Sequence, residues 1–204
     1  MNDYLKILIK SILGGFLIGM GGTVYLMYPE YRFVGAFLFS IGLFGILTFG
    51  FNLYTGKVGY IPNNKPSYLI EVLITIIGNF IGCLILGLSL PMDAAVTCCN
   101  AKLALTPYAV FIKGVCCGIL MYIAVEYYKT KGGYLATFIC VPAFILAGFE
   151  HSIADMFYLS SAGIFTADAL VFVLIVLFGN YIGCCLIPWY RKYVDAPSPK
   201  PKTD

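Results

Sequence analysis

Charged residues are scarce in this sequence, and histidine occurs only once. Lysine, arginine, aspartate and glutamate make up 11% of the 204 residues, whereas hydrophobic residues make up 60%. The mean hydropathy is +0.89. A soluble domain of this length cannot bury so much apolar surface, so the composition excludes that class and indicates that lipid surrounds the chain. We expect one transmembrane domain over residues 1–190 and a disordered tail over residues 191–204.

Several chemical motifs are also missing. A single histidine cannot supply a pair of haem ligands, and no nucleotide-binding motif is present. The eight cysteines have neither the spacing of a zinc site nor that of a redox C-x-x-C motif, and most lie within apolar runs. These absences argue against a membrane redox enzyme. We therefore expect no enzymatic activity, no metal, no cofactor and no nucleic-acid partner, and we interpret most cysteines as small buried hydrophobic residues.

Six apolar segments are long enough to cross a bilayer, either alone or together with the residues directly after them. The sequence thus predicts an all-α integral membrane protein. The first segment is too long for a cleaved signal and lacks an A-x-A-like site, so we interpret it as the first span. The segments cover residues 4–27, 33–46, 69–90, 108–128, 134–147 and 169–190.

Two of these segments are interrupted by polar residues and glycines. Residues 47–57 interrupt the second span, and residues 148–157 interrupt the fifth. The second interruption contains Glu150, the sole histidine His151 and Ser152. Polar groups at membrane depth are costly unless they line a cavity or a water-filled path. We therefore place the functional site at these interruptions.

The connections between the spans indicate how the chain is oriented. We expect loops at residues 56–68 and 159–168, a more polar stretch at 91–107 and a tight connection at 129–133. Ten of the thirteen basic residues lie at the termini or in the connections on the same side as the termini. Basic residues favour the cytoplasmic side, so both termini are predicted to be cytoplasmic, in the plasma membrane.

The two halves of the sequence also echo each other. Residues 77–83 read IGNFIGC, and residues 178–184 read FGNYIGC. An interrupted span precedes each of these stretches at an equivalent place. Three spans followed by three more give the halves opposite topology, so the pattern predicts an inverted repeat whose interrupted helices meet near the membrane midplane.

These motifs resemble those of the formate/nitrite transporter family. Residues 148–157, GFEHSIADMF, are similar to its signature G-F-E-H-S-[IV]-A-N-M-[FY], and residues 53–56, LYTG, are similar to its L-F-T-[GS]. Gly78-Asn79 and Gly179-Asn180 match its third and sixth helices. The resemblance runs from the first span to the sixth. It implies an aquaporin-like six-helix protomer and a homopentamer in which each protomer has its own pore.

The resemblance also assigns roles to individual residues. It makes His151 the central histidine, Thr55 the residue that faces it, and Lys102 the lysine on the periplasmic side. It implies a cytoplasmic constriction that includes Phe39 and Leu43, and further hydrophobic constrictions at Leu53 and Phe144. The supporting residues that it implies are Asn79, Tyr122, Glu150, Asp155 and Asn180.

Three departures from the family pattern stand out. Asp155 replaces the usual asparagine and adds an acidic group close to an anion path. Tyr122 occupies a position that often holds asparagine. We also expect an N-terminal region too short for the amphipathic gating helix of some members.

The resemblance implies a channel or proton-linked transporter for small monovalent anions, such as formate, nitrite, hydrosulfide or short carboxylates. The alternative is a pore for a neutral solute, such as ammonia, water or a protonated weak acid. A histidine suits proton coupling because its unperturbed pKa lies near physiological pH. The sequence leaves open whether His151 donates a proton directly, donates through water, or leaves protonation to the field of the lysine.

Overall fold

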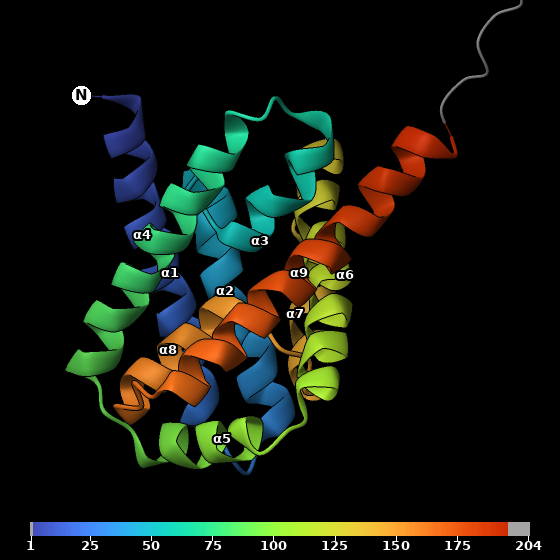
Figure 1. Ribbon diagram of the computed structural model, residues 1–204. Coiled ribbons are helices and arrows are strands. Elements are labelled where there is room, and N and C mark those ends of the chain that lie inside the picture. The colour runs from blue at the N-terminus through green and yellow to red at the C-terminus, as the bar shows by residue number, and fades with distance from the viewer. Residues whose placement is uncertain (1, 196–204) are drawn as a thin grey trace, which may run out of the picture.

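The computed structural model describes residues 2–195, and every regular element within that range is helical (Figure 1). The predicted all-α class is confirmed. The elements are α1 (Asp3–Leu26), α2 (Arg32–Phe49), α3 (Tyr54–Lys57), the 3₁₀ helix η1 (Val58–Asn63), α4 (Tyr68–Ser89), α5 (Asp93–Leu103), α6 (Pro107–Lys131), α7 (Leu135–Leu146), α8 (Ser152–Ala162) and α9 (Ala167–Tyr193).

Five of the described helices are long and apolar enough to cross a membrane. These are α1, α2, α4, α6 and α9. Helices α7 and α8 have only 12 and 11 residues, whereas a crossing takes about 20. Many large apolar side chains on the long helices are exposed, as lipid-facing surfaces require. The chain is therefore a multi-pass membrane protein.

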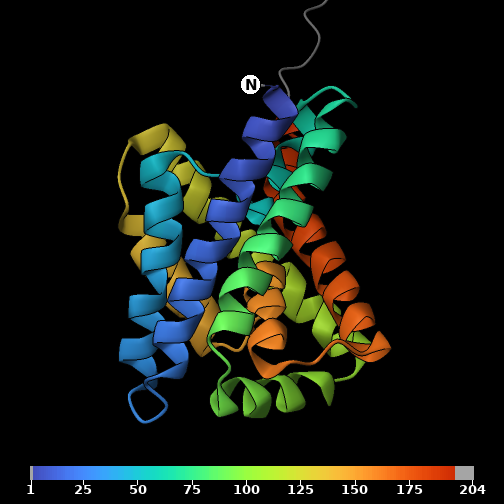
Figure 2. The same cartoon turned by 90° about the vertical axis from the view of Figure 1, so that its left-hand side faces the viewer.

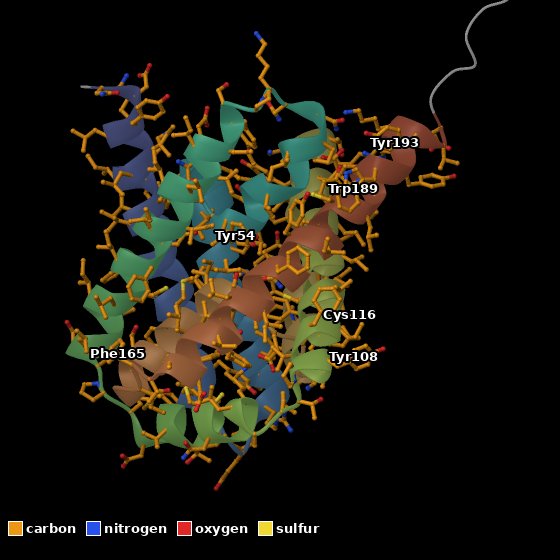
Figure 3. All side chains as sticks on the ribbon, viewed as in Figure 1. Tyr54, Tyr108, Cys116, Phe165, Trp189 and Tyr193 are labelled. Carbon is orange, nitrogen blue, oxygen red and sulfur yellow. The ribbon has the colours of Figure 1, made fainter. Side chains whose placement is uncertain are left out.

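The two ends of the molecule differ. The start of α1 and the end of α9 lie at the same end, which we call the terminal face, and α5 lies across the opposite end, which we call the α5 face (Figure 1). Figure 3 places Trp189 and Tyr193 near the terminal face and Tyr108 and Phe165 toward the α5 face. Aromatic side chains near both ends are typical of the two membrane–water interfaces.

Glycines bring two pairs of helices into backbone contact. Helix α1 lies beside α4, as Figure 2 shows, and α6 packs against α9 in the same way. A Cβ atom on Gly82 would lie 2.0 Å from the carbonyl oxygen of Ile12, and one on Gly183 would lie 2.0 Å from that of Val115. Only glycine permits this approach, so both Gly-Asn motifs sit on tightly packed helix pairs.

The two expected loops are partly helical, and so are the polar stretch at 91–107 and the start of the expected tail. Helix α5 occupies much of the polar stretch at 91–107, and α3 and η1 occupy the expected loop at 56–68. Helix α8 continues to Ala162, so the expected loop at 159–168 begins later. The expected tail at 191–204 begins inside α9, which ends at Tyr193, and its residues from 196 onward lie outside the described range. Backbone groups in these polar stretches are still paired by helical hydrogen bonds. Hydropathy measures how apolar a stretch is and therefore does not predict such helices.

Candidate functional site

The first interruption follows the end of α2. Gly50 has a φ of 65°, in the left-handed region that glycine adopts at helix ends, and its amide donates to the carbonyl of Ile46. The chain then extends through Leu53, which has φ −122° and ψ 137°, before α3 begins at Tyr54. Leu53 therefore lies in extended backbone between two helices.

The second interruption has the same form. Gly148 has a φ of 67° and follows the end of α7. His151 is extended, with φ −109° and ψ 111°, and forms the N-cap of α8. One extended residue thus precedes each short helix, and here that residue is the only histidine.

Asn79 on α4 holds the first interruption in place. Its Oδ1 accepts a hydrogen bond from the amide of Tyr54 at 2.9 Å. Its Nδ2 donates to the carbonyls of Asn52, at 2.9 Å, and Ser11, at 2.7 Å. Tyr54 is labelled near mid-height in Figure 3, far from either face. The asparagine therefore supplies the hydrogen bonds that this non-helical segment lacks inside the molecule.

Asn180 on α9 holds the second interruption with the same three kinds of bond. Its Oδ1 accepts from the amide of Ser152 at 2.9 Å, and its Nδ2 donates to the carbonyls of Glu150, at 2.9 Å, and Gly114, at 2.8 Å. Asn79 and Asn180 are both fully buried. The two predicted support residues are thus structural clamps on the two interruptions.

Two cysteines link the halves to each other. The Cys83 thiol contacts the carbonyls of Gly15 and Ile153 at 3.4 and 3.3 Å, and the Cys184 thiol contacts those of Gly118 and Thr55 at 3.2 and 3.5 Å. Each therefore reaches the short helix of the opposite half. We interpreted the cysteines only as small apolar residues and did not predict these thiol–carbonyl contacts between the halves. Cys83 and Cys184 are each the last residue of the repeated motif that contains Gly-Asn.

The two interruptions meet through His151 and Thr55. The Nε2 atom of His151 lies 3.1 Å from Oγ1 of Thr55, and both side chains are buried. The amide of Ala154 donates to Nδ1 of the same ring at 3.2 Å. Because Nδ1 accepts, the proton of the neutral imidazole is assigned to Nε2, which then donates to Thr55.

Aromatic rings cover the histidine on one side. The Phe144 ring stacks on the His151 ring with centroids 5.6 Å apart, and the Phe39 ring meets Phe144 edge-on at 6.1 Å. We expected Phe39 beside Leu43 in the cytoplasmic constriction. Phe39 lies about one helical turn before Leu43 on α2, and a constriction that contains both residues stays a prediction.

A cavity of about 360 Å³ lies between His151 and α5. We call it the α5-side cavity. Its inner end is lined by Phe144 and His151. Its charged lining residues are Arg32, Lys102, Lys113, Glu150 and Asp155.

Lys102 forms ion pairs with both acidic residues that line this cavity. Its Nζ pairs with Oε2 of Glu150 and lies 2.9 Å from Oδ1 of Asp155. Burial alone would lower the pKa of Lys102, but Asp155 and Glu150 outweigh that effect and raise its pKa well above the ordinary value. Lys102 therefore stays positively charged next to the histidine.

A second cavity, of about 330 Å³, lies toward the terminal face. We call it the terminal-side cavity. It is lined by Leu43 and Leu53 at its apolar end and by Lys57 and Lys129. Phe39 and Thr55 line neither cavity and are almost completely buried. A short closed segment, largely apolar except at His151 and Thr55, thus separates two cavities that each carry basic residues.

Two further residues lie in unexpected places. Lys113, which the sequence did not lead us to include among the pore residues, lines the α5-side cavity and donates to the carbonyl of Gly148 at 2.9 Å. The feature of the sequence that could have identified it is the position of this lysine in the first turns of the fourth span. Tyr122 instead packs against Tyr60 of η1, with ring centroids 5.8 Å apart, and lines neither of the two cavities.

The fold and the site describe a helical membrane protein with two interrupted segments that meet between two cavities. The sequence model of the family "Formate/nitrite transporter" matches residues 2–194. The chain therefore belongs to the formate/nitrite transporter family, as its motifs predicted.

Individual relatives are more distant. The nitrite transporter NirC of Escherichia coli (strain K12) is 27% identical over 183 residues, an alignment that covers 76% of this chain and 68% of the relative. NirC of Salmonella typhimurium is also 27% identical, with 76% and 67% covered.

Two solved structures share the fold. One, described as an FNT family ion channel, has a TM-score of 0.85 at 22% identity and covers 96% of this chain and 92% of its own. The other, described as a pentameric formate channel with formate bound, has a TM-score of 0.76 at 21% identity, with 92% and 96% covered.

Proposed function

We propose that the protein carries small monovalent anions of weak acids, such as formate, nitrite, hydrosulfide or short carboxylates, across the plasma membrane. The observation that carries this proposal is the contact between His151 Nε2 and Thr55 Oγ1, which joins the two interruptions between the two cavities. The path would run from the α5-side cavity past His151 to the terminal-side cavity. Membership of the family and the names of its relatives support the same class of substrate.

We count α2 with α3, and α7 with α8, as two interrupted spans. Together with α1, α4, α6 and α9 they give six spans in one transmembrane domain and an inverted repeat of two halves. The matching clamps of Asn79 and Asn180 support this reading. The excess of basic residues then places the terminal face in the cytoplasm and the α5 face outside.

The charges support an anion as the substrate. Lys102, Lys113 and Arg32 line the α5-side cavity, and Lys57 and Lys129 line the terminal-side cavity. Basic residues at a pore mouth concentrate anions by their field. The closed segment between the cavities is too apolar for a bare anion, because losing hydration there is costly. Transport therefore needs a hydrogen-bond donor or a proton at that point.

His151 is the donor in this scheme. Its Nε2–H points at Thr55, so a passing anion can exchange with Thr55 as the acceptor. Proton linkage is part of the proposal. Direct donation would need a second proton at Nδ1, where the amide of Ala154 already donates. The geometry thus favours a hydrogen-bonding role for the imidazole and a proton source elsewhere in the path.

We further propose a homopentamer with one pore in each protomer. The fold is shared with a protein described as a pentameric formate channel. Native mass spectrometry of the detergent-purified protein should give five copies. A stable monomer that still transports would contradict this assembly.

A pore for a neutral solute is the alternative, and the apolar closed segment favours it. Phe39, Leu43, Leu53 and Phe144 are each at most 3% exposed, which suits ammonia or a protonated weak acid. Such a pore would not need Lys102. Charge replacement at Lys102 should therefore leave neutral-solute flux unchanged but reduce anion flux.

Uptake into liposomes tests the proposal. Purified protein is reconstituted, and uptake of labelled formate and labelled nitrite is measured beside current recordings and beside a panel of hydrosulfide, acetate and lactate. Saturable uptake that falls in Lys102→Met, with ammonia flux unchanged, is expected. Uptake equal to that of protein-free liposomes would overturn the proposed function.

A further inference from the structure

Two carboxyl groups share one ammonium group beside His151. Nζ of Lys102 pairs with Oε2 of Glu150 and lies 2.9 Å from Oδ1 of Asp155. The side chains of Glu150 and Asp155 are 2% and 1% exposed. Among residues 2–195, Lys102 is the only cation in ion-pair contact with either carboxyl group. If both acids were ionised, one buried negative charge would lack a partner.

Asp155 is the group left without compensation. Neither of its oxygens has a hydrogen-bond partner of good geometry among the described residues, and the ion pair formed by Oδ1 is the one with Lys102. The ammonium of Lys102 approaches Oδ1 within ion-pair distance but is aimed at Glu150. Asp155 nevertheless lines the α5-side cavity. A buried carboxyl group with open acceptor sites beside a cavity is poised to bind a proton.

The start of α8 does not provide the missing hydrogen bonds. The amide of Ser152 donates to Asn180, that of Ala154 to His151 Nδ1, and that of Asp155 to the carbonyl of His151. None of these amides is directed at a carboxylate, although helix N-termini often stabilise anions.

Other titratable groups around the pair do not replace the missing charge. Helix α4 contributes the Cys83 thiol, which contacts the carbonyl of Ile153, and α9 contributes the neutral amide of Asn180. The remaining titratable or charged groups that line the cavity are Tyr25 on α1, Arg32 on α2, Cys98 on α5, Lys113 on α6, and His151 and Tyr158 beside and on α8. Lys113 donates to the carbonyl of Gly148, and no ion pair joins Arg32 to either acid.

Electrostatics then decide the protonation state. Two carboxyl groups next to each other in a low-dielectric site cannot both ionise without a counter-charge for each. Lys102 supplies one. A single proton should therefore be bound next to Lys102, and Asp155, whose oxygens lack hydrogen bonds, is the group that binds it.

We propose that Asp155 binds one exchangeable proton beside the ion pair of Lys102 and Glu150 and forms the proton-binding site of the α5-side cavity. Its role in transport rests on the proposed function, whereas the bound proton itself does not. Three cationic side chains face two carboxyl groups in this cavity, so binding the proton raises its formal charge from +1 to +2. The cavity holds an anion more strongly in that state. Each anion that binds is thereby accompanied by a proton, which accounts for proton linkage without a second proton on His151.

Infrared spectroscopy tests the proton on Asp155 directly. The wild-type protein at neutral pH should show the carbonyl stretch of a buried carboxylic acid, which titrates as the pH is raised. Removing either acid leaves one carboxylate on Lys102 and no acid, so the band should vanish in Asp155→Asn and also in Glu150→Gln. Asp93→Asn, an exposed change of the same type on α5, should keep it. A wild type without the band, or a band that survives in both variants, overturns the proposal. If Glu150→Gln does not fold, the infrared result for Asp155→Asn alone decides the test. That variant should fold, because asparagine is the usual residue of the family at this position.

The pH dependence of uptake tests the consequence for transport. Wild-type uptake of labelled formate should fall as external pH rises through the titration of Asp155, because the cavity loses one positive charge. Asp155→Asn cannot lose that charge, so its uptake at alkaline pH should exceed that of wild type on the order of tenfold. Asp93→Asn should follow wild type. Coinciding profiles for wild type and Asp155→Asn would reject the linkage. Absence of formate and nitrite uptake from every protein would instead reject the proposed function, and the infrared result would still stand.

Discussion

Asn79 and Asn180 form the same three hydrogen bonds on opposite halves of the molecule. Each bridges one extended residue: Asn79 binds the backbone on either side of Leu53, and Asn180 does so around His151. Each also binds a carbonyl of the helix packed beside it, that of Ser11 or Gly114. Leu53 and His151 therefore occupy equivalent positions, and their side chains are what make the two halves chemically different.

The clamp predicts a large loss of stability when Asn180 is shortened. Asn180→Ala leaves the amide of Ser152 and the carbonyls of Glu150 and Gly114 without partners. Each buried unpaired group costs about 1–3 kcal/mol, so the variant should lose about 3 kcal/mol or more. Thermal unfolding of the detergent-purified protein measures this. Asn100→Ala, at an exposed position on α5, is the matched control and should unfold like wild type. A melting temperature of Asn180→Ala equal to that of the control would contradict the clamp.

Thr55 should matter through its hydroxyl group alone. Thr55→Val keeps the shape of the side chain but removes the acceptor for His151 Nε2–H. The ring then has an unpaired buried donor and loses its fixed orientation, so formate uptake should fall about tenfold, equivalent to about 1.4 kcal/mol. Thr55→Ser keeps the acceptor and should retain most of the activity. Equal losses in both variants would show that packing, and not the hydrogen bond, is what matters.

Replacement of His151 separates hydrogen bonding from proton donation. His151→Phe keeps a ring but has no donor, so uptake should cease. His151→Asn keeps a donor without a titratable ring and should still show pH-dependent uptake, because Nδ1 is already occupied by the Ala154 amide. Labelled formate uptake at several external pH values measures both. If His151 donates its proton directly, the His151→Asn variant should show only a pH-independent leak of formate. If the His151→Phe variant takes up formate as wild type does, the histidine has no role in the mechanism.

Cys98 provides a test of sidedness. This thiol lines the α5-side cavity and is partly exposed, so a charged, membrane-impermeant thiol reagent added outside whole cells should modify it and reduce uptake. Burial raises the pKa of Cys98, although Lys102 opposes this. Only the thiolate reacts, so labelling should accelerate as the pH rises beyond the range of an ordinary thiol. Cys98→Ser should be resistant. If the reagent does not modify Cys98 from outside whole cells but does modify it in inverted vesicles, the proposed orientation is wrong.

The sequence by itself determined the class of protein and the two places where its helices are interrupted. Sixty per cent hydrophobic residues demand lipid as the solvent, and this requirement depends on composition alone. The repeated Gly-Asn motif and the polar residues around His151 identified the segments where helices end, because glycine and buried polar groups act locally on the backbone. Residues 148–157, together with residues 53–56 and the two Gly-Asn pairs, predicted the family, which the match over residues 2–194 confirmed.

Only the tertiary structure decided which side chains meet. It brought Lys102 to both Glu150 and Asp155 across 48 and 53 positions of sequence, and it turned Lys113 into the same cavity. It also packed the Phe39 ring against Phe144 and the Tyr122 ring against Tyr60 of η1. Such contacts depend on the rotation and depth of packed helices, which hydropathy does not encode. For the same reason, the sequence did not predict the contacts of the Cys83 and Cys184 thiols with carbonyl groups of the other half. The sequence around a buried cysteine does not indicate whether such a carbonyl lies next to it.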